Sequence, residues 1–400
     1  MVAGLLLEIR RGTQSALLVI READPPSSPV DVSVAADRVE VKSGGSCKAA
    51  TLPPEIRLAP SSCRGLRRLP GDGLHLRMCL SRPPPGADLV STWRESLKPQ
   101  KNYVFYCQSC GDIIVKDRKF LRVLPLPSEN WSALVEEWCC HPNPFARSTL
   151  HPQYGDCFLG ETFFLMNSGS ESHVPEFPMC CSETGRHTSQ SRSNLKSKEN
   201  TRVVCKRCKT MLGETVSSEQ MRLLLPPLDL ENTIKYYVTE VIIQPSDGSF
   251  SPKPRSQFIQ SMVAQCLVEL SSAKSTFRFT LKGDNGKIFI LIWLLNSDTL
   301  LVESSGSSSS HGVSTPFGDI FMPSSGPVGA WNAVKVLYQP CIKSRNKELA
   351  DAWENDIGVH PLKFPSETCL ELLLILGLST TSLPPSLRHM NSFQVAFLKM

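Results

Sequence analysis

The sequence predicts an α+β protein with a β-rich N-terminal half, a long-range zinc site of four cysteines, and a helix-plus-sheet C-terminal domain. Three observations lead to this prediction. Apolar and polar residues alternate in short runs over the first hundred residues, two Cys-x-x-Cys motifs lie far apart, and an amphipathic helix is followed by an alternating hairpin near the C-terminus.

Residues 1–100 are predicted to form a β-rich domain. The apolar runs 5–7 and 16–20 flank Gly12, as the two strands of a hairpin would. Val39 and Val41 alternate with polar residues at the period of a strand with one buried face. Clusters of proline separate these runs, so we expect the strands to be short.

Residues 234–400 are predicted to form the α+β C-terminal domain. An alternating run at 277–281, turn residues at 283–286 and an apolar run at 287–295 predict a hairpin with one buried strand. Residues 370–376 predict a buried helix, and residues 393–397 a final strand. An amphipathic helix precedes the hairpin, and its apolar stripe consists of Phe258, Ile259, Met262, Val263, Cys266, Leu267 and Leu270.

The composition is that of a globular protein without a membrane or direct nucleic-acid partner. The chain has 400 residues, of which 41% are hydrophobic and 20% charged, and its formal net charge is only +5. No run of five basic residues occurs, and no apolar stretch reaches the roughly 18 residues that span a bilayer. Without a recognisable secretory signal, the 15 cysteines indicate thiols used for metal binding or chemistry rather than disulfides.

Two Cys-x-x-Cys motifs predict a structural zinc site made by Cys107, Cys110, Cys205 and Cys208. Each motif supplies half of a tetrahedral thiolate site, and Gly111 permits the positive φ that such a turn needs. The 94 residues between Cys110 and Cys205 add little cost, because each doubling of a loop costs only about 0.6 kcal/mol. Two unrelated pairs and a redox pair are the alternatives, although a redox motif opens a helix and strands follow here.

These motifs bound a predicted zinc-knuckle region over residues 101–215. Within it, residues 182–201 are almost wholly polar and are predicted to be a mobile insertion, because they cannot bury a core. A second vicinal pair, Cys180 and Cys181, has no context that assigns it a role.

Between the motifs lies a Trp-Cys-Cys-His segment with two open interpretations. Trp131 and Trp138 share one face of a predicted helix that ends near Cys139, Cys140 and His141. In the first interpretation the tryptophans anchor a core and one cysteine is merely buried. In the second, a thiol beside an imidazole is exposed, either as a nucleophile or as a ligand for the metal of a partner. Cys140 is then the better candidate, because it adjoins His141 and lies further from the helix.

Several long strings show that the sequence resembles the HECT-like ubiquitin-protein ligases that bind ubiquitin-conjugating enzymes. The resemblance covers nearly the whole chain, and it is specific because many strings match rather than one short motif. The strings lie at residues 105–111, 124–131, 137–142, 206–209 with 212–214, 264–267, 293–296 and 391–400.

The resemblance implies that ubiquitin is accepted from a conjugating enzyme and passed to substrate proteins. It also implies a second role as an alternative, in which residues 125–155 dock into the metal-dependent endonuclease of pre-mRNA 3′-end processing and inhibit it. In that role Cys140 and His141 would approach the partner's metal, and Trp131, Trp138 and Cys139 would dock. We expect a cytoplasmic protein, with the nucleus as a second compartment.

The residues also predict a cysteine that could accept ubiquitin and a surface that could bind the conjugating enzyme. No clear HECT-type catalytic-cysteine tail is present, and Cys266 and Cys369 lie in apolar contexts typical of a core. Cys341 has the most electropositive setting in the C-terminal half, so it is the candidate for a thioester. The conjugating enzyme is predicted to bind around residues 236–266, although burial of that stretch in the core is an equal alternative.

Overall fold

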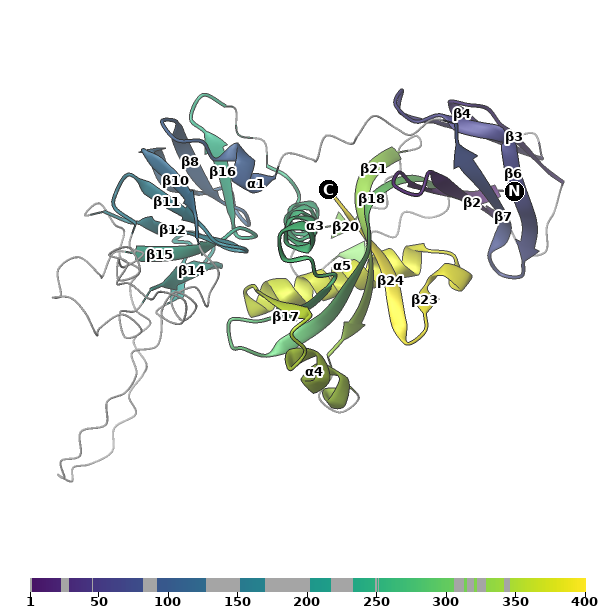
Figure 1. Cartoon of the computed structure of the whole chain (residues 1–400). Helices are drawn as coiled ribbons and strands as arrows, with labels where there is room; N and C mark the ends of the chain where they lie inside the picture. The colour runs from purple at the N-terminus through teal and green to yellow at the C-terminus, as the bar shows by residue number, and fades with distance from the viewer. Residues whose placement is uncertain are drawn as a thin grey trace, which may run out of the picture. The chain divides into compact units, whose positions relative to one another are not determined.

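The structure is a computed structural model that describes most of the chain, and it divides into two compact units (Figure 1). The terminal unit contains Met1–Trp93 and Lys253–Met400, and the middle unit contains Arg94–Pro252. The described residues are 2–22, 29–44, 46–81, 92–126, 152–169, 202–216, 233–248, 250, 252–305, 313–314, 320–321, 329–341 and 346–400.

The terminal unit is built on a ten-stranded sheet. Its main path runs β23-β24-β21-β18-β1-β2-β7-β6, while β17 pairs with both β18 and β22. A separate sheet has the order β3-β4-β5, and β19 pairs with β20. The elements are β1 Val2–Arg10, β2 Ser15–Glu22, β3 Val30–Val34, β4 Arg38–Ser43, β5 Ser46–Thr51, β6 Leu58–Leu69, β7 Gly73–Leu80, α3 Arg255–Lys274, β17 Arg278–Lys282, β18 Ile288–Ser305, β19 Val313–Ser314, β20 Ile320–Phe321, β21 Gly329–Pro340, α4 Lys347–Glu354, β22 Val359–Lys363, α5 Ser366–Ser382, η3 Pro385–Leu387, β23 His389–Met390 and β24 Phe393–Lys399.

The long strand β18 holds the terminal unit together. Its first half pairs with β17, and its second half pairs with β1 from Thr299 to Ser305. The helices α3 and α5 pack against the β17 half, where Ile259, Leu372 and Ile292 share one apolar core (Figure 1). A second core joins β1, β2 and β7 to the small sheet β3-β4-β5. Side chains alternate across each strand, so the opposite face of β1 and β2 contributes Leu6 and Val19 to a third cluster with β24.

The middle unit consists of two sheets joined by aromatic packing. Phe105 on β8 lies 5.7 Å from Phe164 on β12, and Phe164 stacks on Tyr236 of β15, measured between ring centroids. One sheet has the order β10-β11-β12-β15-β14-β13 and the other the order β16-β8-β9. The elements are β8 Asn102–Cys107, β9 Ile113–Lys119, β10 Arg122–Pro125, β11 Asp156–Leu159, β12 Phe163–Asn167, β13 Arg202–Val204, β14 Met211–Thr215, β15 Thr233–Tyr237 and β16 Val241–Pro245, with α1 Trp93–Ser96 at the boundary between the units.

The β-rich character that the sequence predicts is confirmed, and the predicted elements of the C-terminal part have counterparts. α3 contains the predicted amphipathic stripe, α5 contains the buried run 370–376, and β24 contains the final strand. β1 and β2 form the hairpin around Gly12. β18 differs, because it continues past residue 295 to Ser305 and so reaches β1.

The division into units differs from the three consecutive ranges 1–100, 101–215 and 234–400 that the sequence predicts. The N-terminal strands belong with the C-terminal sheet, since β1 pairs along β18 from Gly4 opposite Ser305 to Arg10 opposite Thr299. Residues 233–245 belong to the middle unit instead, because β15 and β16 pair with β12, β14 and β8. The predicted insertion at 182–201 lies outside the described residues.

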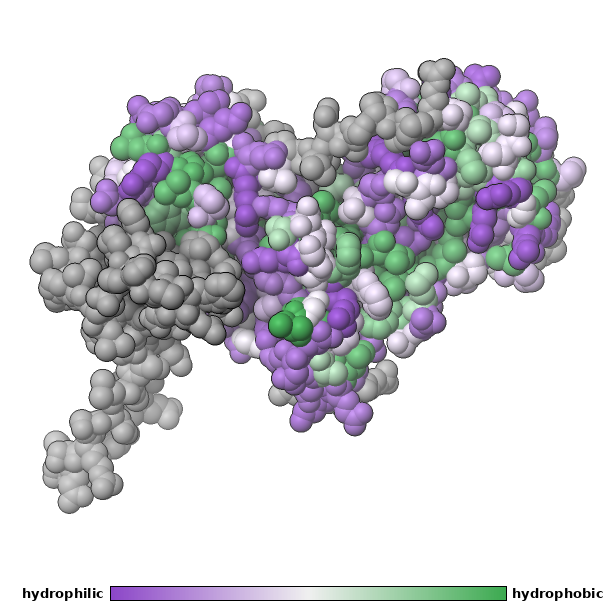
Figure 2. Space-filling model, in the orientation of Figure 1, coloured by the Kyte–Doolittle hydropathy of each residue, from purple (hydrophilic) through white to green (hydrophobic). Residues whose placement is uncertain are grey.

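Two surface properties complete the description. Among the described residues, no helix combines the length and the apolar character needed to cross a bilayer. Hydrophobic side chains are scattered between hydrophilic ones on the face shown in Figure 2. The most exposed large ones include Leu66, Phe277 and Ile357.

A buried ion pair crosses the central sheet of the terminal unit. Lys335 on β21 donates to both carboxylate oxygens of Glu8 on β1 at 3.0 Å, and Arg10 donates to Glu8 at 2.7 Å. Burial acts to raise the pKa of Glu8, but the hydrogen bond from Arg10 and the charges of Lys335 and Arg10 outweigh it, so this pKa is lowered. Burial lowers the pKa of Lys335, and the Glu8 carboxylate opposes that change.

We expect Glu8→Gln to lower the opening free energy of backbone amides in β1 by about 3–5 kcal/mol, because it leaves Lys335 buried without its counter-ion. Hydrogen exchange of the full chain measures this, and adding Lys335→Met to the same chain should restore most of the loss. The pKa of Glu8 is lower in the folded chain than in the unfolded chain, where it is about 4.3. The contribution of Glu8 to the free energy of unfolding is therefore fully present above the unfolded pKa and is lost as the pH falls through the folded pKa. A Glu8→Gln chain with unchanged exchange in β1 would contradict this account.

Candidate metal centre

Four cysteine sulfurs meet at one point of the middle unit. The Sγ atoms of Cys107, Cys110, Cys205 and Cys208 all lie within 4.8 Å of one another. Cys107 and Cys208 are 3.6 Å apart, and so are Cys110 and Cys205, so each of these sulfur pairs joins one motif to the other. These separations are far longer than the roughly 2.05 Å of a disulfide bond. The four cysteines are free thiols that could hold a metal ion.

The two motifs have the same backbone geometry. In the first, the Gly111 N–H donates to the Cys107 carbonyl at 2.8 Å, and the Cys107 N–H donates to the Asp112 carbonyl at 2.8 Å. In the second, the Lys209 N–H donates to the Cys205 carbonyl at 2.9 Å, and the Cys205 N–H donates to the Thr210 carbonyl at 2.9 Å. Each motif is therefore a tight turn that points both of its sulfurs to the same side.

Each turn closes a hairpin, and the two hairpins belong to different sheets. The first motif begins in the last residue of β8 and leads into β9, and the second follows β13 and leads into β14. β8 pairs with β16, whereas β14 pairs with β15. A metal ion at this point would bridge the two sheets of the middle unit.

The first turn is covered by an aromatic pair. Phe250 stacks on Tyr106 with 4.2 Å between the ring centroids. A Cβ atom added to Gly111 would lie 3.4 Å from the Phe250 ring. The ring would therefore tolerate a Cβ here at van der Waals contact, and it is the φ of 71° that favours glycine at position 111.

The four thiols differ in how readily they ionise. Burial, the first of several causes, raises the pKa of Cys107, and burial also raises the pKa of Cys110. Burial acts in the same direction on Cys208, but hydrogen bonds with Thr210, Cys110 and Cys107 together outweigh it and lower the pKa of Cys208 to about 7. The Sγ of Cys208 and the Oγ1 of Thr210 are 3.3 Å apart. A bound cation would favour the thiolate form of all four groups.

Sequence reasoning did not identify three residues of this centre. Lys209 adopts a φ of 62° at the position that corresponds to Gly111, and Thr210 supports the Cys208 sulfur. Alignment of the two motifs by their second cysteine would have marked both. Phe250 lies far from either motif in sequence, so no local signal indicates its contact with Tyr106.

The predicted thioester candidate, Cys341, lies apart from this centre in the terminal unit. It directly follows β21, and its backbone N–H donates to the Phe289 carbonyl at 2.8 Å. Burial raises the pKa of Cys341 to about 11, and the charge of Lys287 does not offset this. The thiol is half-buried. Lys343 and Arg345, which made its setting electropositive in the sequence, lie outside the described residues. Cys266 and Cys369 are both buried, in agreement with the core interpretation.

The stretch 236–266, predicted to bind the conjugating enzyme, is divided between the two units. Tyr236 and Tyr237 are buried in the middle unit, and Ile259, Val263 and Leu267 are buried in the terminal unit. The apolar side chains that motivated the prediction are thus core residues of two different units. A buried strand or helix and a partner-binding one share the same apolar pattern, which is why the sequence could not separate them.

The Trp-Cys-Cys-His segment lies outside the described residues. Trp131, Trp138, Cys139, Cys140 and His141 all fall in the range 127–151, and Cys180 and Cys181 fall in the range 170–201. Docking of residues 125–155 into a metal-dependent endonuclease stays a prediction from the sequence.

We expect Gly111→Ala to lower the free energy of unfolding of the metal-loaded middle unit by about 1–2 kcal/mol, because a left-handed backbone is strained for any residue with a Cβ. Lys209→Gly is the matched variant in the second turn, and it should be neutral or stabilising by up to about 1 kcal/mol. Hydrogen exchange of the β8 and β13 amides in the full chain reads both changes. Equal destabilisation by the two variants would show that the turns do not have this geometry.

Comparison with known proteins places these features in a family. The family described as "HECT-like Ubiquitin-conjugating enzyme (E2)-binding" matches residues 8–395. The chain is 53% identical over 401 residues to an "E3 ubiquitin-protein ligase" of Bos taurus, covering 100% of this chain and 98% of the relative. For the protein of the same name from Homo sapiens, identity is 52% over 399 residues, covering 98% and 97%.

The Mus musculus protein of that name is 53% identical over 397 residues, covering 98% of this chain and 97% of the relative. No solved structure matches the chain. The resemblance noted from the sequence strings is confirmed by these matches over nearly the whole length. The chain belongs to the HECT-like family of proteins that bind ubiquitin-conjugating enzymes.

Proposed function

We propose that the protein is a ubiquitin ligase that takes ubiquitin from a conjugating enzyme to substrate proteins, with a structural zinc ion in its middle unit. The observation that carries the proposal is the match over residues 8–395 to a family that binds conjugating enzymes, together with full-length relatives named as ubiquitin ligases. In the overall reaction a thioester to ubiquitin breaks, and an amide to a substrate amine forms. A cytoplasmic and nuclear location goes with this proposal.

The geometry of the four thiols supports zinc. Zn–S bonds of about 2.3 Å at tetrahedral angles separate the sulfurs by about 3.8 Å. Two of the separations here are 3.6 Å, and all lie within 4.8 Å. A site made only of thiolates prefers soft or borderline ions such as Zn²⁺ over the hard ions Mg²⁺ and Ca²⁺. Cys107, Cys110, Cys205 and Cys208 would be the four ligands.

Zinc would contribute to the stability of the middle unit, because its ligands come from two sheets. Structural zinc sites supply about 10–16 kcal/mol of apparent binding free energy in small domains. That is far more than the loop-closure cost of bringing together Cys110 and Cys205, which grows only logarithmically with the 94 residues between them. The ion would thus fix the relative position of the β8–β9 and β13–β14 hairpins.

The environment of Cys341 favours transfer that does not use this thiol. A nucleophilic cysteine attacks as the thiolate, and burial disfavours that form. With a pKa raised to about 11, Cys341 is largely protonated at neutral pH. We therefore infer that the protein positions a conjugating enzyme that carries ubiquitin, and that no thioester to ubiquitin forms on Cys341.

We expect about one zinc ion per purified chain, measured by atomic spectrometry, and loss of that ion in Cys205→Ser. The same variant should expose the amides of β8 and β13 to exchange, because the zinc ion that joins the two hairpins is lost. Cys47→Ser is the matched control, since Cys47 is an exposed free thiol in the other unit. Full zinc content in Cys205→Ser, or equal loss in Cys47→Ser, would exclude the assignment.

Cys341→Ala should leave ubiquitin transfer within about twofold of the unchanged chain, because a protonated, half-buried thiol is not the acceptor. Single-turnover discharge of a ubiquitin-loaded conjugating enzyme measures the rate. Gels without reducing agent show at the same time whether a ubiquitin adduct forms on the chain. A reducible adduct that disappears in Cys341→Ala would establish the covalent mechanism instead. Absence of any stimulated discharge by the unchanged chain would refute the ligase proposal itself.

A further inference from the structure

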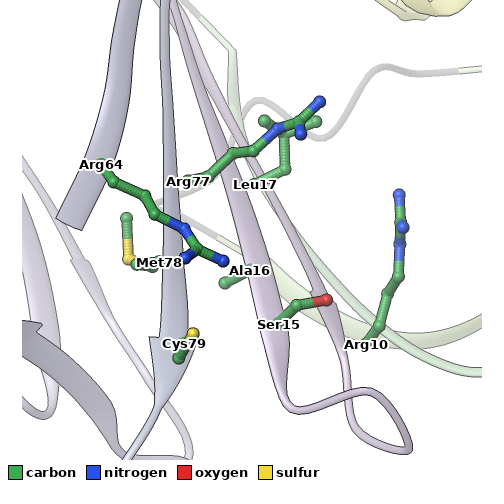
Figure 3. A pocket seen from close by; sticks show the side chains of 8 residues that line it. All are labelled: Arg10, Ser15, Ala16, Leu17, Arg64, Arg77, Met78 and Cys79. Atoms are coloured by element: carbon green, nitrogen blue, oxygen red, sulfur yellow. The ribbon is translucent and has the colours of Figure 1, made fainter. Parts of the chain in front are cut away.

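A hollow with a volume of about 250 Å³ lies on the sheet of the terminal unit and is lined by three arginines (Figure 3). We call it the arginine hollow; its polar rim includes Arg10, Arg64, Arg77 and Ser15, and Leu17 is among its apolar lining. Leu17 and Arg77 are cross-strand partners on β2 and β7. Ala16 and Met78 line the hollow as well, and both also belong to the core that this sheet shares with the small sheet β3-β4-β5.

Arg64 and Arg77 are placed directly opposite each other on neighbouring strands. They are register partners on β6 and β7, where like charges repel and destabilise the sheet. Both side chains are exposed, and no described residue provides a carboxylate partner for either. This repulsion disappears when an anion with two negative charges binds between the guanidinium groups.

The backbone around Arg64 is shaped to direct this side chain. The pairing of β6 with β7 shifts register on both sides of Arg64, and Gly65 has a φ of 67°. Bulges of this kind redirect side chains and are frequent beside binding sites. In Figure 3 the Arg64 side chain extends across the strands toward Ala16 and Ser15. A regular strand would not need the left-handed residue after Arg64.

The third arginine adds positive charge to the hollow. Arg10 is held by Glu8 at 2.7 Å, and Glu8 also accepts from Lys335. One carboxylate therefore faces two cations, which leaves one positive charge uncompensated beside Arg64 and Arg77. The Arg10 side chain is 40% exposed, so its guanidinium remains accessible to a ligand.

We propose that the arginine hollow binds the phosphate group of a phosphorylated peptide. A phosphate monoester carries close to two negative charges and accepts paired hydrogen bonds from guanidinium forks, so it matches Arg64 and Arg77 better than a single carboxylate does. A nucleic acid would need a longer basic groove with aromatic stacking partners, and no aromatic residue lines the hollow.

Protection of a sheet edge does not explain the cluster. β6 is the edge strand of the sheet, and charged residues on edge strands commonly prevent aggregation. Arg77, however, lies on β7, which has β6 on one side and β2 on the other. An interior strand needs no such protection, so the edge position of β6 does not account for Arg77.

Fluorescence anisotropy of the full-length chain tests the proposal with a labelled heptapeptide that has one phosphoserine flanked by glycine and serine. Matched peptides carry serine or glutamate in its place. The variant is Arg64→Gln/Arg77→Gln, and the control is Arg38→Gln/Arg57→Gln, which removes the same charge from two exposed surface ion pairs of the same unit. Because no ubiquitin transfer is measured, the result is independent of the proposed ligase function.

The phosphoserine peptide should bind more tightly than the glutamate peptide, and the serine peptide should not bind. Affinity should fall about tenfold or more in Arg64→Gln/Arg77→Gln and less than about twofold in the control. The free Arg64→Gln/Arg77→Gln chain should melt no lower than the unchanged chain, because a repulsion has been removed. Equal loss in both variants, no preference for phosphoserine, or stronger competition by inorganic phosphate or a single-stranded oligonucleotide than by the phosphopeptide would overturn the proposal.

Discussion

The middle unit depends on the meeting of four sulfurs from two hairpins in different sheets. Cys107 lies 3.6 Å from Cys208, and Cys110 lies 3.6 Å from Cys205, so each of these sulfur contacts joins one hairpin to the other. Burial alone raises the pKa of Cys107 and would keep that thiol protonated. A cation reverses this preference, because coordination deprotonates a thiol. A bound ion would therefore be coupled to the fold, because the same four thiols would hold the ion and join the two hairpins.

The terminal unit depends on a different long-range contact. β18 carries the helices α3 and α5 on its first half and pairs with β1 along its second half, so one strand unites the two ends of the chain. The buried Glu8–Lys335 pair crosses the same region from β1 to β21. On this face the sheet also presents the arginine hollow, in which Arg10 is shared with Glu8. The Glu8 carboxylate thus contacts both Lys335 of the buried ion pair and Arg10 of the arginine hollow.

Local patterns in the sequence were sufficient for most elements and for the four thiols. The 3.6-residue stripe of α3, the alternation in β17 and the Cys-x-x-Cys spacing each reflect contacts within a few residues. Pairing between β1 and β18 could not be predicted in this way, because strand register between distant segments leaves no local mark. For the apolar residues near Tyr236 and Ile259 the sequence left a partner surface and the core as equal alternatives, since a core and an interface bury similar side chains, and the structure has both residues buried. Lys209 was missed because a left-handed residue is recognisable from sequence mainly when it is glycine.

X-ray absorption at the zinc edge of the purified full-length chain identifies the atoms bound to the metal. Four thiolate ligands give a single shell of about four sulfur neighbours near 2.3 Å, with no nitrogen or oxygen bound to the metal. Cys208→Ser should convert this shell to about three sulfurs and one lighter atom or release the metal. A shell dominated by nitrogen or oxygen, or one unchanged by Cys208→Ser, would contradict the four-thiolate centre.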